Sequence, residues 1–251
     1  GILALVDENS GSYSYTPNSN SNGADSFTWQ VSDGIDSSTI ATVNITINAV
    51  NDAPVTSSGI LTINEDGSGG GTLNAVDTEA DSLIFTIITE PTKGTVTLSE
   101  EVAAEYSYAP DTNENGTDTF TFKANDSNSD SDVATVTITI TPVNDSPTAL
   151  DGAFGIAEDT EVNEQLLIAS DADGDDLTYT IVTQSTKGTV VLTNTGTGAY
   201  SYSPNADEEG SDRFTFRVND GTADSNTATV TITLNSTNDA PVAENGSLIL
   251  N

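Results

Sequence analysis

The sequence predicts an all-β fold, a tandem series of seven-stranded antiparallel sandwiches in an extended array. The first observation behind this prediction is an internal repeat: the tetrapeptide Asn-Asp-x-Pro begins at residues 51, 144 and 238. A period of 93 to 94 residues indicates that one structural unit has been copied along the chain. The second observation is that apolar and polar residues alternate in short segments of each copy, which is the period of a half-buried strand.

Seven such segments recur in order in each complete copy. Large aromatic residues occupy alternate positions in the later segments, so they are expected to face a core, and Trp29 lies in the same inward register. Short alternating strands separated by turn residues are typical of an immunoglobulin-like sandwich of two sheets. The glycine run at 67–71 is interpreted as a flexible turn. In the first complete copy the strands centre on Leu61/Ile63, Leu73/Ala75, Phe85/Ile87, Val96/Leu98, Tyr106/Tyr108, Phe120/Phe122 and Val136/Ile138.

The repeat also predicts the domain boundaries. Residues 1–52 correspond to the C-terminal half of a module, 53–146 and 147–240 to two complete modules, and 241–251 to the first strand of a further one. About 100 residues suffice for an independent sandwich core. We therefore expect each complete module to fold alone.

The composition limits the possible partners. The chain has 39 acidic residues, five basic residues and no histidine, which gives a net charge of −34. Nucleic acids are excluded as electrostatic partners because binding phosphates requires clustered Lys and Arg. No run of about 18 apolar residues is present, so this segment is not expected to insert into a membrane. Cations are the expected partners, because neutralising such a charge relieves self-repulsion.

Catalysis is not expected. Without His and Cys, the chain cannot form a Ser-His-Asp or Cys-His system. The absence of Cys also removes thiolate ligands, which leaves the oxygen ligands that hard cations prefer. The sequence therefore predicts a protein that is not an enzyme and whose metal chemistry, if any, uses oxygen ligands.

Two loops carry carboxylates at alternate positions, Asp77-Thr-Glu79-Ala-Asp81 and Asp171-Ala-Asp173-Gly-Asp175. Calcium takes about six to eight oxygen ligands, and alternating carboxylates on one loop can supply several of them. An EF-hand is excluded for the second loop, because positions six and twelve hold Asp176 and Val182 in place of Gly and Glu. The remaining ligands must then come from other loops. The alternative is that these residues form solvated turns, which Asp and Asn favour.

Four motifs together resemble the cadherin-like repeats of very large bacterial surface adhesins. They are Glu158-Asp159, Asp171-x-Asp173, Val218-Asn-Asp220-Gly221 and Asn238-Asp239-x-Pro241, and the resemblance extends over essentially all 251 residues. It implies tandem sandwiches that hold calcium at the junctions between modules. Animal cadherins have Asp two residues before the linker Asn, whereas this chain has Ala49, Pro142 and Ser236. We therefore expect one or two ions at each junction.

The resemblance also implies which residues bind the ions. Each junction would draw ligands from the end of one module, the linker and the beginning of the next. The first junction would use Asn51, Asp52, Asp77, Glu79 and Asp126; the second Glu65, Asp111 or Glu114, Asn144, Asp145, Asp171, Asp173, Asp175 and Asp220; and the third Glu158, Asp207 or Glu209, Asn238 and Asp239.

These expectations favour a structural function. The chain is interpreted as part of a secreted stalk on the bacterial cell surface that supports adhesion and is stiffened by Ca²⁺. Its partners would be the neighbouring modules of the same chain, and also other copies in a fibre or a ligand on a host cell surface. Two alternatives remain open: an array in which one module binds a glycan or protein, and non-catalytic accessory modules of a larger secreted enzyme.

Overall fold

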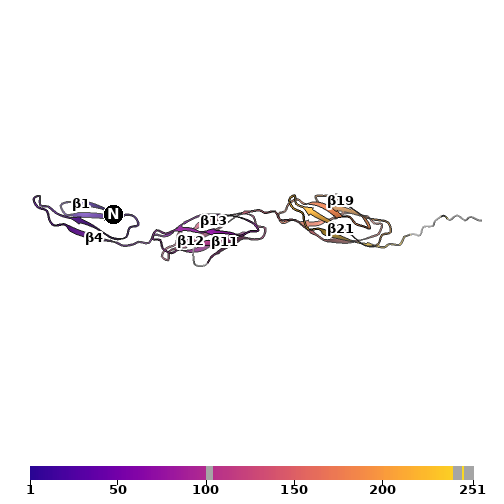
Figure 1. Cartoon of the computed structure of the whole chain (residues 1–251), viewed down its shortest axis with the longest axis horizontal. Helices are drawn as coiled ribbons and strands as arrows, with labels where there is room; N and C mark the ends of the chain where they lie inside the picture. Colours follow the sequence, from indigo (N-terminus) through magenta and orange to yellow (C-terminus); the bar gives the residue numbers. More distant parts are fainter. Residues whose placement is uncertain (100–103, 240–244, 246–251) are drawn as a thin grey trace, which may run out of the picture. The chain divides into compact units, whose positions relative to one another are not determined.

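The structure is a computed structural model that describes residues 1–99, 104–239 and 245. The chain divides into two compact units, Gly1–Pro142 and Val143–Asn251. The described residues form 22 strands, β1 to β22, and no helix (Figure 1). No helix in this part of the chain could therefore cross a membrane. The prediction of an all-β fold is confirmed.

The first unit begins with four strands that form two separate hairpins. β1 pairs with β2 and β3 pairs with β4, both antiparallel. None of residues 1–50 is buried. Trp29, which was expected to face a core, is 49% exposed. The inward register of Trp29 thus does not lead to burial, because residues 1–50 form only two sheets of two strands each. The strands are β1 (Ile2–Asp7), β2 (Ser12–Thr16), β3 (Gly23–Trp29) and β4 (Ala41–Ile47).

The rest of the first unit is a complete sandwich. Its two main sheets have the strand orders β6-β13-β12-β9 and β10-β11-β7, and a short pair, β5-β8, flanks them. Figure 1 labels three of these strands, β11, β12 and β13. The bounds are β5 (Val55–Ser57), β6 (Gly59–Asn64), β7 (Gly69–Thr72), β8 (Asn74–Val76), β9 (Ile84–Thr89), β10 (Gly94–Leu98), β11 (Glu105–Pro110), β12 (Gly116–Asn125) and β13 (Ala134–Thr141).

The second unit repeats this topology. Its sheets have the orders β15-β22-β21-β18 and β16-β20-β19, with the short pair β14-β17. The bounds are β14 (Thr148–Leu150), β15 (Gly152–Ala157), β16 (Val162–Leu166), β17 (Ile168–Ser170), β18 (Thr178–Thr183), β19 (Gly188–Asn194), β20 (Ala199–Pro204), β21 (Gly210–Asn219) and β22 (Ala228–Asn235).

Three features differ from the sequence-based expectation of seven antiparallel strands. Within the described residues each sandwich has nine strands, because short strands such as β5 and β14 lie too close to their neighbours to show a period. The interpretation of 67–71 as a turn is wrong, since Gly69–Thr72 forms β7. A Cβ on Gly70 would lie 2.2 Å from the carbonyl oxygen of Tyr106, so glycine permits this close approach. Finally, β6 runs parallel to β13, as β15 does to β22.

Each sandwich has one core formed by the inward residues of both sheets. In the first unit Tyr108, Phe120 and Phe122 are completely buried, and in the second unit Tyr202 and Phe214 are as well. The aromatic residues at strand spacing are therefore core residues, as their alternation predicts. Two aspartates, described below, are buried beside them.

Candidate metal centres

One pair of buried carboxylates is satisfied entirely by the protein. Asp212 is 3% exposed, and its oxygens accept hydrogen bonds from the backbone N–H groups of Thr186, Lys187 and Arg213 and from the hydroxyl of Tyr202. The hydroxyl of Thr186 also donates to Oδ1. Burial raises the pKa of this carboxyl, but the hydrogen bonds outweigh burial and the net pKa is lowered. Asp118 repeats the arrangement with Tyr108 in the first unit. These carboxylates have no need of a cation.

The loop carboxylates of the second unit are arranged differently. Asp171, Asp173 and Asp175 follow β17, and each contributes a carboxylate oxygen to a group in which all three atoms lie within 4.8 Å of one another. The backbone N–H groups of Asp173 and Asp175 donate to Asp171 Oδ1 at 3.0 Å and 3.1 Å, which folds the loop around this carboxylate. Like charges so close together repel, so the loop concentrates negative charge at one point.

Two further segments bring oxygen-bearing residues to this loop. The N–H of Asp145, just before β14, donates to Asp173 Oδ2 at 2.7 Å. Asn144 donates through Nδ2 to Asp220 Oδ2 at 3.0 Å, and Asp220 follows β21. The residues Asn144, Asp145, Asp171, Asp173, Asp175 and Asp220 are called the linker cluster below. All six were predicted from the sequence to belong to one junction.

The chemistry of this cluster points to a cation. Asp171 Oδ2 is buried and accepts no hydrogen bond, which is costly for a carboxylate oxygen. Desolvation, followed by the charges of Asp171, Asp173 and Asp220, raises the pKa of Asp175. A bound divalent ion would supply the positive charge that both carboxyl groups lack. Several oxygen ligands and no nitrogen or sulfur ligand fit calcium.

The first unit contains the matching residues. Asn51 Nδ2 donates to Asp126 Oδ2 at 2.8 Å, and the N–H of Asp52 donates to Glu79 Oε2 at 3.2 Å. Asp126 is 4% exposed, and hydrogen bonds from Asn51 and from backbone N–H groups lower its pKa despite desolvation. Asp77 Oδ2 is buried without a hydrogen-bond donor, as Asp171 Oδ2 is. The five residues predicted for the first junction thus lie on loops joined by hydrogen bonds or adjacent along the chain.

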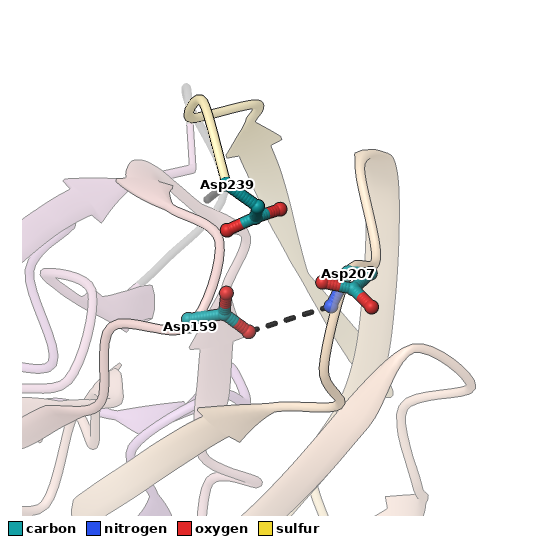
Figure 2. Close-up of side chains that lie close together, drawn as sticks. All are labelled: Asp159, Asp207 and Asp239. Carbon is teal, nitrogen blue, oxygen red and sulfur yellow. Dashed lines mark hydrogen bonds between the residues drawn. The ribbon is translucent and has the colours of Figure 1, made fainter. Parts of the chain in front are cut away.

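A second cluster of the second unit lies on different loops. Figure 2 shows Asp159, Asp207 and Asp239 pointing toward one another from the turns after β15 and β20 and from the segment after β22. Their carboxylate oxygens lie within 4.8 Å of one another. The N–H of Asp207 donates to Asp159 Oδ1 at 3.4 Å, the bond drawn in Figure 2. Desolvation, followed by the charges of Asp207, Glu158 and Asp159, raises the pKa of Asp239.

Glu158 is a buried neighbour of this second cluster. It is 6% exposed and accepts hydrogen bonds at Oε1 from the N–H and hydroxyl of Thr237. These bonds tie the turn after β15 to the segment that carries Asp239. Glu65 is the matching residue of the first unit, with 2% exposure, and Asn115 Nδ2 lies 3.3 Å from its Oε2.

Four other predicted ligands are described by contacts within their own unit or by their exposure. Glu114 pairs with Lys93, at 3.6 Å between Oε2 and Nζ. The backbone carbonyl of Glu209 accepts a hydrogen bond from Lys187, while Asn238 donates to the carbonyl of the next residue. Asp111 is exposed. The involvement of these four residues in metal binding stays a prediction.

Sequence reasoning missed Asp159 as a ligand candidate. Asp159 has φ of +57°, and this left-handed backbone turns its carboxylate toward Asp207, which also has a positive φ, +59°. The signal was present in the Glu158-Asp159 pair, but only the glutamate was assigned a role. Asp and Asn are the non-glycine residues that most readily adopt such a conformation.

Comparisons with known families match this architecture along the chain. Residues 3–48 match the family Cadherin-like domain, residues 51–142 match Bacterial cadherin-like domain, and residues 144–233 match Bacterial Ig domain. The chain is a tandem array of bacterial cadherin-like and immunoglobulin-like domains. The resemblance found in the sequence is thereby confirmed. No curated protein sequence matches the array.

Solved structures similar to the cadherin-like array support its fold. Mouse cadherin-23 EC22-24 matches with a TM-score of 0.58 and 18% identity, over 94% of this chain and 83% of that one. Human mucin-like protocadherin EC1-2 matches with a TM-score of 0.51 and 18% identity, over 73% and 98%. The array also spans 37% of the length of an endo-fucoidan hydrolase of glycoside hydrolase family 107, over 94% of its own length, at 20% identity and a TM-score of 0.36. The likeness to the two cadherin structures, at 18% identity, concerns the fold alone.

Proposed function

We propose that the cadherin-like array is a non-catalytic spacer of a secreted bacterial surface protein, stiffened by calcium and supporting adhesion. One observation carries this proposal: Asp171 Oδ2 is buried without a donor in a group of three carboxylates. A solvated acidic turn would instead leave such an oxygen in contact with water. Membership in a family of bacterial tandem repeats supports the placement outside the cell.

The residues of each cluster have distinct roles in this proposal. In the linker cluster, Asp171, Asp173 and Asp175 would hold the ion, and calcium would supply the positive charge when bound. Asn144 holds Asp220 through its amide, while the N–H of Asp145 holds Asp173, so both linker residues orient ligands from another loop. Such orienting contacts limit the freedom of the segment before β14.

Stiffening follows from linkage between the metal and the linker. If the linker is ordered only when its ligands surround an ion, binding restricts the angle between successive modules. Without calcium, the net charge of −34 makes the modules repel one another and weakens their compact fold. Bound calcium would neutralise part of this charge and so reduce the repulsion. The function of such a spacer is to hold an adhesive region away from the cell, and this array would be one segment of it.

Small-angle scattering and thermal melting test the proposal together. Chelating calcium with EGTA is expected to lower the melting temperature and to broaden the distribution of maximum dimensions. Magnesium at the same ionic strength is the control, because Mg²⁺ requires smaller octahedral sites and gives up its water reluctantly. Unchanged melting and scattering in EGTA would rule out a calcium-stiffened spacer and leave a plain acidic tether.

A further inference from the structure

An Asn-Gly pair recurs at the same turn of two successive modules. Asn22-Gly23 and Asn115-Gly116 lie 93 residues apart, and their glycines begin β3 and β12. Both glycines have a positive φ, +97° and +94°, which favours glycine at this position. In the second unit Glu209-Gly210 occupies the same place, and φ of Gly210 is +88°. The fold thus requires glycine after a residue that differs between the two complete modules.

An asparagine followed by glycine can lose its side-chain amide without an enzyme. The backbone nitrogen of Gly116 attacks Cγ of Asn115, and the new N–Cγ bond closes a five-membered succinimide ring. The Cγ–Nδ2 bond breaks, and Nδ2 leaves as ammonia with the proton given up by the attacking nitrogen. Water then adds to one of the two imide carbonyls and opens the ring to Asp or isoaspartate. Both residues are exposed, so water reaches them.

Lys93 contacts the peptide group that has to react. Its Nζ donates to the backbone carbonyl oxygen of Asn115 at 2.6 Å. That oxygen and the N–H of Gly116 belong to one peptide group. When the N–H loses its proton before the attack, negative charge spreads onto the oxygen, where the ammonium group stabilises it. The lysine therefore favours the form of Gly116 that attacks Cγ.

The position of this lysine is part of the fold. The N–H of Lys93 donates to Asp118 Oδ2 at 2.9 Å, and its carbonyl accepts the N–H of Asp111 at 2.8 Å. Lys187 repeats the contact in the second unit, where its Nζ donates to the carbonyl oxygen of Glu209. Glutamate has a longer side chain that ends in a carboxylate, so it cannot form the five-membered ring by losing ammonia. The first unit instead places a reactive amide beside its lysine.

The group that would leave lies beside a buried carboxylate. Asn115 Nδ2 donates to Glu65 Oε2 at 3.3 Å, and Glu65 is 2% exposed. Loss of ammonia replaces this neutral amide by a carboxylate next to Glu65. The second unit already has carboxylates at both equivalent positions, Glu158 and Glu209. The reaction would thus give the first unit the charge pattern that the second unit has from the beginning.

We infer that Asn115-Gly116 is a self-modification site, at which Lys93 promotes succinimide formation and the loss of ammonia. The product adds one negative charge to the chain. Where isoaspartate forms, the main chain gains one methylene group directly before β12, at the residue that pairs with Ile140. The conversion consumes only water, and it does not depend on bound calcium.

Peptide mapping by mass spectrometry tests the site. The whole chain is incubated in mildly alkaline buffer with EGTA, and the conversion of amide to acid is followed at each asparagine. Asn113 is the internal reference, because it is exposed and lies in the same turn but is followed by Glu114. We expect Asn115 to convert while Asn113 stays an amide, and Asn115→Gln to abolish the mass gain of that peptide. Conversion of Asn115 no faster than that of Asn113 would overturn the inference.

Substitutions of Lys93 test its role. Lys93→Met should slow the conversion of Asn115 about fivefold, less than for a fully buried donor because this ammonium group is partly exposed. Lys93→Arg keeps a charged donor and should stay close to the wild-type rate. The three lysines of the chain donate to Asn115, Asp130 and Glu209, so Asn22 is the control site whose rate neither variant should change.

The same measurement separates promotion from stiffening. If Lys93 only held the turn rigid, Lys93→Met would loosen the turn and speed the conversion of Asn115. An unchanged or faster rate in Lys93→Met, relative to Asn22 in the same sample, would therefore overturn the role of the lysine.

Discussion

Asp212 and Asp171 lie in the same unit, and both have buried carboxylate oxygens, yet their surroundings differ. Asp212 accepts hydrogen bonds from three backbone N–H groups and from the hydroxyl of Tyr202. Asp171 Oδ1 accepts two N–H groups, but its Oδ2 accepts none and lies among other carboxylates. The fold itself thus provides the donors for the carboxylate of Asp212, whereas it provides none for Oδ2 of Asp171.

The largest expected effect comes from breaking the satisfied carboxylate. Asp212→Asn would turn an acceptor oxygen into an NH₂ group that faces N–H donors in a buried site. We expect a loss of about 3 kcal/mol in the free energy of unfolding of the second unit, equal with and without calcium. Urea denaturation measures it, with the exposed Glu161→Gln of the same unit as the control. A loss that depends on calcium would mean that Asp212 is coupled to the metal site.

Replacing Asp171, whose carboxylate is not satisfied by the protein, should change stability in calcium but not without it. Asp171→Asn removes a charge from the linker cluster, so the calcium-free protein should be as stable as the wild type or slightly more so. The stabilisation by calcium, about 2.7 kcal/mol at 100 times the Kd, should be largely lost. Thermal melting at several calcium concentrations measures both. An unaltered calcium response would show that Asp171 is not a ligand.

A smaller loss of stability is expected from replacing Tyr202, which donates a hydrogen bond to Asp212. Tyr202→Phe keeps the buried ring but removes one of five donor groups, so the remaining four still hold the carboxylate. The expected loss is about 1.5 kcal/mol, independent of calcium. Denaturation of Tyr200→Phe serves as the matched control. Tyr200 is also buried, and burial raises its pKa to about 12, but among the described residues no carboxylate accepts a hydrogen bond from its hydroxyl. Equal losses in the two variants would contradict a special role for the Tyr202–Asp212 bond.

The smallest effect is a change in the pH of maximum stability. The pKa values of Asp175 and Asp239 are raised in the folded state, so the folded protein binds more protons there and calcium-free stability should increase as pH falls from 7 through these pKa values. The pKa of Asp212 is lowered, so its contribution is present above about pH 4 and is lost below it. In EGTA the maximum should lie in mildly acidic solution, and calcium should move it toward neutral pH, since ions and protons compete. A maximum at the same pH in both conditions would contradict this assignment.

The strands that could be predicted are those whose side chains alternate over many residues. Ala134–Thr141 and Ala228–Asn235 show this pattern, and both form the strands that it predicts. The parallel partners of these strands could not be predicted, because alternation records which face is buried and not the direction of a neighbour. Gly69–Thr72 has no side-chain pattern at all, so its place in a sheet depends on contact with Tyr106.

The candidate site was predictable to a similar extent. The repeat and the alternating carboxylates of Asp171-x-Asp173 identified the linker cluster, because its residues are close in sequence or recur at the module period. Asp159 was missed because its side chain meets Asp207 through backbone turns with positive φ. The pairing of Glu114 with Lys93 was also missed, since it depends on the packing of loops distant in sequence.

A crystal structure of the chain grown with calcium, with anomalous data, tests the central claim most directly. The account predicts an ion about 2.3–2.6 Å from Asp171 Oδ2, with further oxygens from Asp173 and Asp175, and a matching ion at Asp77 Oδ2. It would be contradicted if both oxygens were hydrated and no anomalous peak lay near either of them at saturating calcium.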